Sequence, residues 1–376
     1  MDVKKISLIF LSLAIFLASC APSLNDDDGV LQQNEEDAPV ETSIVPGSRL
    51  EEDTYRMVLP YRTSAARGVI DRQIFNRVDI DEMEEGLRRH SLDVFDPDDH
   101  YFQEGRFLDE ATVLEWIDEL NPPRPDNPED WDRERYENNP RIFSHILEQN
   151  YLVPGEGQTV QVGGISIGIA LKSVFRYQLE RGGEYFTYDI SMNEMLAKGY
   201  EVAEMVVQRL REEEEVPDVP IMVALYREAP QYSPVPGNYV AKTVVPSGES
   251  TIGDWETIDE EYILFPSNEA DDKYPADFEN FNDFANEIAE FFPNYVGAIG
   301  EGFYVEGELQ RLTIELPIEF YGKAEVIGFT QYAHDRIQEI FPAYFDLELN
   351  VTSSEKVESL IYRNAGEEEL TVHIYH

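Results

Sequence analysis

The sequence predicts an α+β fold, in which a mainly antiparallel sheet packs against helices and follows a small helical N-terminal section. Residues 345–351 alternate apolar and polar side chains, as a strand with one buried face does. Residues 191–211 instead place apolar side chains at the three- and four-residue spacing of a helix. Strand and helix patterns in mixed order along one chain favour the α+β class.

Residues 151–376 are predicted to form the α+β domain. The expected strands span residues 163–171, 186–190, 221–226, 309–320, 345–351, 357–362 and 370–375. The expected helices span residues 191–211, 277–292 and 323–341. The order strand–helix–strand occurs around 186–226 and again around 309–351, so a duplicated unit is one interpretation of the pattern.

Residues 54–150 are predicted to form the helical N-terminal section. Residues 80–94 and 109–120 each place apolar side chains on one helical face, and Asp109 is a suitable N-cap for the second helix. Residues 141–149 also fit a short helix.

The first nineteen residues have the pattern of a secretory signal peptide. Lys4 and Lys5 precede an apolar run over residues 6–17, which is shorter than the roughly 17–25 residues of a membrane span. The run ends in Leu17-Ala18-Ser19-Cys20, which matches the lipobox that bacterial lipoprotein processing recognises. We therefore expect cleavage between Ser19 and Cys20. The alternative is an ordinary signal peptide followed by a chance cysteine.

Cys20 is the only cysteine of the chain. We expect its thiol to carry a diacylglyceryl group, because two acyl chains give stable attachment where one gives only marginal binding. This lipid would place the protein at the cell membrane, anchored on the extracytoplasmic face. With Cys20 modified, the mature chain has no thiol for a disulfide, so the fold must depend on its apolar core.

The charge balance is strongly acidic. The chain has 29 Lys and Arg residues against 76 Asp and Glu residues, and without residues 1–19 the net charge is −48. Phosphate binding is driven by Lys and Arg, so nucleic acid is not expected as a partner. Residues 20–53 are acidic and poor in aromatic side chains, which predicts a disordered tether between the lipid and the folded part.

No catalytic motif stands out in the sequence. The G-x-S-x-G, P-loop and dinucleotide-binding patterns are missing. His373 and His376 would point to opposite faces of a strand, and Asp96-Pro97-Asp98-Asp99 lacks the later residues of a calcium loop. We therefore expect no cofactor, no metal and no enzyme activity. A structural or ligand-binding envelope protein is the first interpretation of the folded part, with an enzyme as the alternative.

Several unusual stretches give the chain a family likeness. They are NRVDIDEMEEGL (76–87), YFQEGRFLDEATV (101–113), GGISIGIAL (163–171), VPGNYVA (235–241), YILFPS (262–267), FPNYVGAIGEGFY (292–304) and IEFYGKAEVIGFTQY (318–332). With these strings in this order, the chain resembles the CamS family of bacterial lipoproteins, the sex pheromone precursors.

The resemblance implies that the signal peptide is the source of a pheromone. In that family, proteolysis after lipoprotein cleavage frees a hydrophobic heptapeptide, which induces plasmid-bearing cells to conjugate. The family peptide reads AIFILAS. The candidate here is Leu13-Ala14-Ile15-Phe16-Leu17-Ala18-Ser19, in which one isoleucine is missing. The implied partners are the membrane, the lipoprotein-processing enzymes and a pheromone receptor.

Overall fold

The structure is a computed structural model that describes residues 29–33, 42–45, 54–74, 76–155, 159–292, 295–320, 322–354 and 356–376. The chain divides into two compact units. The first takes in Met1–Arg62, Phe95–Gln103 and Tyr151–Gly163, and the second takes in Thr63–Val94, Glu104–Asn150 and Gly164–His376.

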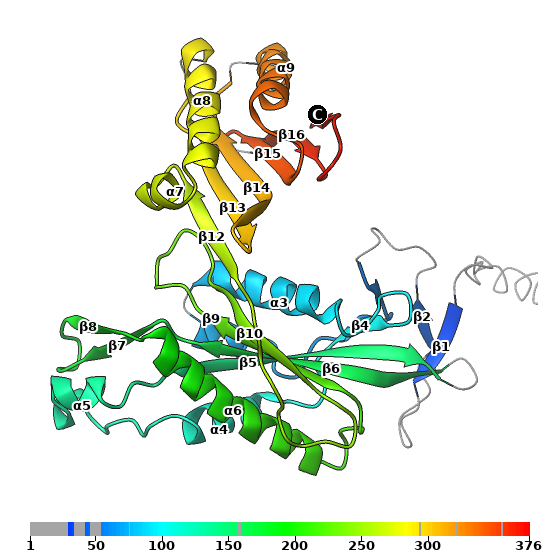
Figure 1. The fold of residues 1–376 in the computed structure, drawn as a ribbon, viewed down its shortest axis with the longest axis vertical. Coiled ribbons are helices and arrows are strands. Elements are labelled where there is room, and N and C mark those ends of the chain that lie inside the picture. The colour runs from blue at the N-terminus through cyan, green and yellow to red at the C-terminus, as the bar shows by residue number, and fades with distance from the viewer. Residues whose placement is uncertain are drawn as a thin grey trace, which may run out of the picture. The chain divides into compact units, whose positions relative to one another are not determined.

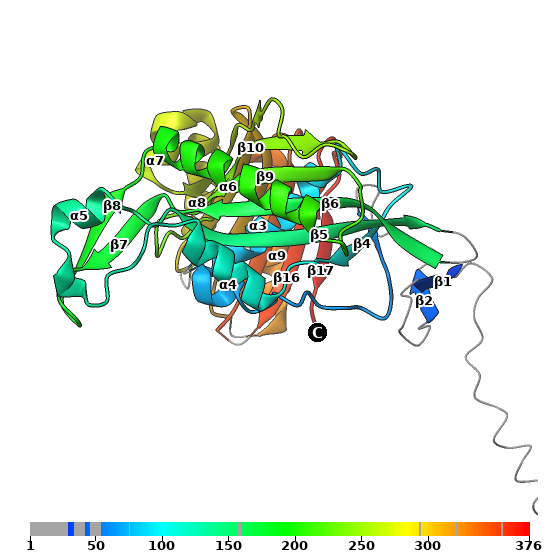
Figure 2. The ribbon, with the colours of Figure 1, turned by 90° about the horizontal axis from the view of Figure 1, so that it is seen from below.

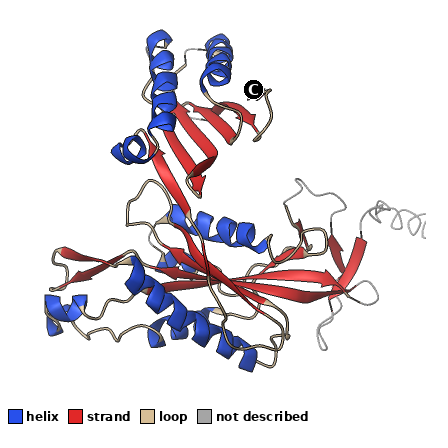
Figure 3. Cartoon of the chain, viewed as in Figure 1, coloured by secondary structure: helices blue, strands red, loops and turns tan. Residues whose placement is uncertain are grey.

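Helices and strands interleave along the chain (Figures 1 and 3). The strands are β1 (Gly29–Gln33), β2 (Thr42–Val45), β3 (Arg56–Met57), β4 (Tyr101–Glu104), β5 (Phe143–Pro154), β6 (Thr159–Leu171), β7 (Val174–Gln178), β8 (Tyr185–Asp189), β9 (Ile221–Arg227), β10 (Asn238–Val245), β11 (Glu256–Thr257), β12 (Glu260–Phe265), β13 (Ile299–Val305), β14 (Glu308–Pro317), β15 (Asp346–Thr352), β16 (Val357–Arg363) and β17 (Thr371–Ile374). The helices are α2 (Ile70–Gln73), α3 (Arg77–Ser91), α4 (Glu110–Glu119), α5 (Arg133–Glu137), α6 (Met192–Glu212), α7 (Asn268–Lys273), α8 (Pro275–Phe291) and α9 (Lys323–Ile340), with a 3₁₀ turn at Pro128–Asp130.

The larger sheet has the strand order β11-β10-β9-β6-β5-β4-β3, and β1 pairs with β6 and β2. Its central strands β6 and β9 are parallel, with Ile165 opposite Ile221 and Leu171 opposite Arg227. Helices α4 and α6 lie on one face of these strands and α3 lies on the other (Figure 2). Because both faces are covered, β9 is a continuous apolar run that is buried from Ile221 to Tyr226.

The smaller sheet has the order β12-β13-β14-β15-β16-β17, and helices α8 and α9 cover one face. Only one face is buried, so the alternation predicted for 345–351 is confirmed: Leu347, Leu349 and Val351 are buried, while Glu348 between them is exposed. The α+β prediction is confirmed, and most neighbouring strands whose pairing is described are antiparallel.

The duplication predicted from the strand–helix–strand pattern is more extensive than the sequence indicated. Six strands of each sheet lie side by side in the order in which they occur along the chain. They are β4, β5, β6, β9, β10 and β11 in the larger sheet and β12, β13, β14, β15, β16 and β17 in the smaller one. In both sets the third and fourth strands are parallel and are connected through a helix, α6 or α9. The first crossover begins at β6, however, and not at the strand predicted over 186–190. That strand is β8, which pairs with β7 in a separate hairpin.

The helix predicted over 141–149 is wrong, because residues 143–149 belong to β5. The sequence places Ile142, Phe143 and Ile146 at a helix-like spacing, but the strand is covered on both faces and buries His145 and Gln149 as well. The sequence of β5 therefore does not show the alternation of apolar and polar side chains that identifies a strand with one buried face. The expected boundary at residue 150 falls inside this strand, and residues 54–150 also contain β3 and β4. This section is mixed in structure and not wholly helical.

The segment 20–53, predicted to be a disordered tether, contains two strands among its described residues. β1 and β2 pair antiparallel, with Val30 opposite Ile44. Val45 is buried with Val58, Leu152 and Val160. The rest of this segment, like residues 1–19, lies outside the described residues.

Candidate functional site

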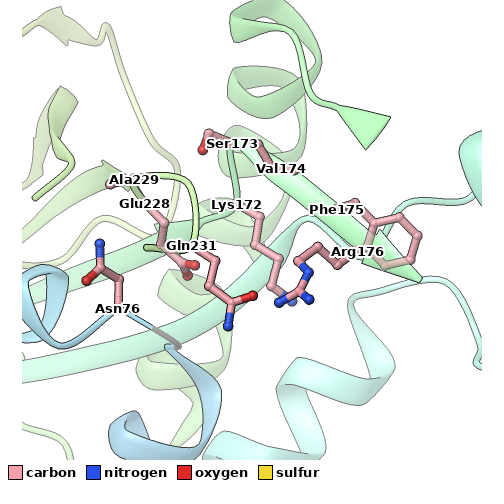
Figure 4. Close-up of a pocket in the computed structure, with 9 residues that line it drawn as sticks. All are labelled: Asn76, Lys172, Ser173, Val174, Phe175, Arg176, Glu228, Ala229 and Gln231. Carbon is pink, nitrogen blue, oxygen red and sulfur yellow. The ribbon is translucent and has the colours of Figure 1, made fainter. Parts of the chain in front are cut away.

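A polar pocket opens where the neighbouring parallel strands β6 and β9 end. The two strands finish at Leu171 and Arg227, and the pocket lining starts with the next residue of each, Lys172 and Glu228. The pocket has a volume of about 70 Å³. It is lined in addition by Asn76, Ser173, Val174, Phe175, Arg176, Ala229 and Gln231 (Figure 4). Crevices at the carboxyl ends of parallel strands commonly bind ligands.

Lys172 and Glu228 bring opposite charges to this pocket. The Glu228 side chain is buried, and burial raises its pKa to about 7, although the Lys172 charge and a hydrogen bond from Ser144 act in the opposite direction. Burial lowers the pKa of the Lys172 ammonium, and the Glu228 charge partly offsets this effect. Burial therefore disfavours the charged form of both groups.

Three oxygen atoms of the pocket residues are buried without a hydrogen-bond partner among the described residues. They are Glu228 Oε1, Ser173 Oγ and Gln231 Oε1. A buried polar atom that stays unpaired costs roughly 1–3 kcal/mol, and native structures contain few of them. Three such atoms among the residues that line one pocket make it the candidate binding site of the described part of the chain.

Asp79 of α3 holds the loop that follows β9. Its Oδ1 accepts hydrogen bonds from the Tyr226 hydroxyl at 2.8 Å, the Gly237 backbone N–H at 2.6 Å and the Ala229 N–H at 3.2 Å. Burial raises the pKa of Asp79, although these three hydrogen bonds oppose the rise. Both ends of the loop are thus fixed to one carboxylate, which sets the position of the pocket residues between them.

The hairpin β7–β8 forms another wall of the pocket. Its residue Tyr177 stacks on Tyr136 of α5 with ring centroids 4.6 Å apart, and Phe175 lies 5.8 Å from Tyr177. Arg176 points to the other side of the strand, where its guanidinium lies 4.3 Å from the ring centroid of Tyr185. Aromatic stacking thus orders one face of the strand, and the Tyr185 ring holds the Arg176 guanidinium on the other.

A second charged cluster lies between α3 and β12. Arg89 contacts Glu82 at 2.8 Å and Glu260 at 3.2 Å, and the Tyr262 hydroxyl donates a hydrogen bond to Glu82. Burial lowers the pKa of Arg89, but the two carboxylates raise it by more, so the guanidinium stays charged. Arg89 pairs with both carboxylates, and we interpret the cluster as a structural ion network.

Comparison with known proteins identifies the family. The model of the CamS sex pheromone cAM373 precursor family matches residues 61–369. The chain belongs to the CamS family. The resemblance inferred from the sequence is thereby confirmed.

Solved CamS structures share this fold. A sex pheromone precursor from Lactobacillus salivarius subsp. salivarius is 28% identical and superimposes with a TM-score of 0.80, over 88% of this chain and 98% of that one. The C-terminal domain of the sex pheromone staph-cAM373 precursor from Staphylococcus aureus is 27% identical, with a TM-score of 0.68, over 80% and 98% of the two chains. None of the curated proteins compared with this chain matches it.

The site residues predicted from the lipobox and from the CamS resemblance lie outside the described residues. These are the lipidation site Cys20, the cleavage site Ser19–Cys20 and the candidate peptide over residues 13–19. In the described part of the chain, no helix is both long and apolar enough to cross a membrane.

The histidines and aspartates considered as metal ligands do not converge. His373 lies on β17, and the His100 ring nitrogen contacts the carbonyl of Asp96 at 2.9 Å. Across the described ranges, no group of three or more His, Cys, Asp or Glu side chains is arranged to hold a metal ion.

Sequence reasoning missed the pocket of this CamS domain. A lysine and a glutamate each follow directly after an apolar strand, at Lys172 and Glu228, and that signal is present in the sequence. These two positions predict a shared pocket only once the two strands are known to be parallel neighbours. Among 76 acidic residues, Glu228 has no local feature that distinguishes it.

Proposed function

We propose that this chain is a lipid-anchored precursor whose signal peptide yields the CamS-family pheromone. The observation that carries the proposal is the order of an apolar run, Leu17-Ala18-Ser19 and the single cysteine, ahead of a domain of the pheromone-precursor family. One cleavage before Cys20 would then have two products. It would free the carboxyl end of the peptide and expose the cysteine that carries the lipid.

The peptide over residues 13–19 is proposed to be the signalling part of the chain. It has no charged side chain, so it can pass through apolar surroundings and enter an apolar receptor site. Compared with AIFILAS it lacks one isoleucine, which shifts every side chain after Phe16. Each buried methylene is worth roughly 0.8 kcal/mol, so we expect its activity on donors that respond to AIFILAS to fall more than tenfold.

A conjugation assay tests this assignment. The signal peptide of this chain is placed on an unrelated lipoprotein, and the full chain is given an unrelated lipoprotein signal peptide. Synthetic LAIFLAS and AIFILAS are the reference inducers. We expect induction to follow residues 1–19 into the chimera. Induction that follows the folded domain, with an inactive LAIFLAS, would overturn the proposal.

For the folded domain we propose an extracytoplasmic binding role, not an enzyme activity. The pocket at the ends of β6 and β9 supports this role, because it combines opposite charges with buried oxygens that lack partners among the described residues. A bound small molecule recovered unchanged after incubation with the protein would support binding. Its chemical conversion would favour the enzyme alternative.

A further inference from the structure

The pocket at the ends of β6 and β9 offers groups of both charges to a ligand. Lys172 and Arg176 contribute the ammonium and guanidinium groups, and Glu228 contributes a carboxylate. Figure 4 shows Lys172 and Glu228 at the two strand ends and Gln231 in the loop that follows β9, all three lining the pocket. No ion pair joins Lys172 to Glu228 within 4.0 Å in the described part of the chain.

The unpartnered oxygens indicate which ligand groups fit. Glu228 is 6% exposed and Ser173 is 3% exposed, so neither side chain reaches bulk water easily. Glu228 Oε1 and Gln231 Oε1 are acceptors and call for a ligand that donates hydrogen bonds. The Ser173 hydroxyl, also without a partner among the described residues, can donate to a ligand acceptor.

We propose that this pocket binds a small free α-amino acid as a zwitterion. The ligand ammonium would contact the carboxylate of Glu228 and the amide oxygen of Gln231. The ligand carboxylate would contact Lys172 and Arg176 and accept a hydrogen bond from Ser173. The inference rests on the proposed binding role of the domain, and it names the ligand class.

Ligands with a single charge fit this pocket less well. A simple anion would pair with Lys172 and Arg176 but would face the buried Glu228 carboxylate, and a simple cation would face the two basic groups. A free anion is also repelled by the chain's net charge of −47, whereas a zwitterion is neutral. The volume of about 70 Å³ favours small members of the class.

Calorimetric titration of the full chain, purified in detergent, tests the ligand class. The probes are the twenty common amino acids, with acetate, methylammonium and inorganic phosphate as ligands of one charge. We expect glycine, alanine or another small amino acid to bind at least tenfold more tightly than acetate or methylammonium. The same amino acid should raise the melting temperature of the protein.

Two variants assign the contacts. Glu228→Gln should weaken binding of that amino acid at least tenfold, and Lys172→Met should do the same. The matched controls are Glu180→Gln, in the turn of the hairpin that carries Arg176, and Lys198→Met on α6. Neither control residue lines the pocket, so both should bind as the unchanged protein does. Melting curves without ligand verify that each variant is folded.

The possible results test two proposals separately: that the ligand is an amino acid, and that the domain has a binding role. If acetate, methylammonium or phosphate binds as tightly as every amino acid, the zwitterion inference fails and the binding role stands. If no probe binds, both fail. Binding of an amino acid that folded Glu228→Gln and Lys172→Met retain at full strength would place the ligand elsewhere and overturn the assignment of this pocket.

Discussion

Glu148 and Glu228 are both buried carboxylates with different surroundings. Glu148 accepts backbone hydrogen bonds from Arg106, Phe107 and Leu108, at distances of 2.8 to 3.2 Å. Burial raises its pKa, and these hydrogen bonds limit the rise. Glu228, in contrast, keeps one oxygen without a partner among the described residues. Glu148 therefore stabilises a loop, whereas Glu228 is the carboxylate that we propose contacts a ligand.

Glu148→Ala should destabilise the protein. It removes the acceptor of three backbone N–H groups, and each buried donor left unpaired costs roughly 1–3 kcal/mol. We expect a loss of at least ~3 kcal/mol in the free energy of unfolding, measured by urea denaturation. Glu115→Ala, at an exposed position of α4, should change it by less than about 0.5 kcal/mol. Equal stability of the two variants would contradict this account of Glu148.

Glu228→Gln should change how stability depends on pH. The carboxyl titrates at its ordinary value of 4.5 when unfolded and at about 7 when folded, so the folded state binds the proton more tightly. This contribution to stability is complete below the unfolded pKa and is lost as pH rises through about 7. Glutamine does not titrate, so the Glu228→Gln variant does not lose this contribution to stability between about pH 4.5 and pH 7.

The melting temperature of Glu228→Gln should therefore exceed that of the unchanged protein at about pH 8, and the advantage should shrink toward about pH 5. At about 1.4 kcal/mol per pKa unit the change is worth up to ~3 kcal/mol. Lys172 and Asp79 also act on Glu228, the first lowering its pKa and the second raising it. A constant difference in melting temperature across this range would show that Glu228 does not titrate there.

At the scale of elements, the corner between β9 and β10 is fixed by close backbone packing. A Cβ at Gly237 would lie 1.9 Å from the Arg227 carbonyl oxygen, a contact that only backbone movement can relieve. Gly237→Ala should lower the free energy of unfolding by about 2–3 kcal/mol. It should also weaken ligand binding in the pocket, since the loop after β9 carries Glu228 and Gln231.

Gly253→Ala is the matched control for this substitution. It lies in the loop after β10, and a Cβ there would meet no atom within 4 Å. Its unfolding curve should superimpose on that of the unchanged protein within about 0.5 kcal/mol. If both alanine variants unfold alike, the close approach at Gly237 does not limit the fold.

Elements whose buried residues are apolar could be predicted from the sequence, whether one face is buried, as in β15, or both, as in β9, but β5, which also buries polar side chains, could not. The helix predicted to begin after Asp109 is α4, and the Asp109 side chain accepts a hydrogen bond from the Thr112 N–H as an N-cap does. The alternation over 345–351 correctly indicated β15. β5 was mistaken for a helix because both of its faces are buried, including polar residues such as Asn150, which leaves no alternation.

The pocket could not be predicted because its residues come together only through the fold. Lys172 and Glu228 are far apart in sequence and meet because β6 and β9 are parallel neighbours. Nothing in the sequence pairs these strands, since the hairpin β7–β8 and helix α6 lie between them. The pattern instead placed residues 186–190 and 221–226 in one strand–helix–strand unit.

At the scale of the whole molecule, the net charge of −47 predicts a salt effect on stability. Neighbouring carboxylates repel, and salt screens them beyond about 8–10 Å at physiological strength. The melting temperature should therefore rise as sodium chloride increases from low to moderate concentration. Chloride is preferable to sulfate, which stabilises proteins by exclusion from their surface. A flat or falling melting temperature would mean that charge repulsion is not limiting.

We propose that one cleavage before Cys20 both anchors the domain and defines the end of the peptide. Mass spectrometry of the chain's N-terminus, isolated from the membrane fraction of expressing cells, tests it most directly. We expect a mature chain that begins at Cys20 and carries at least two acyl chains, whereas Cys20→Ala should remain uncut or be cut elsewhere without lipid. A mature chain with an unmodified Cys20, or one that begins at another residue, would contradict the claim.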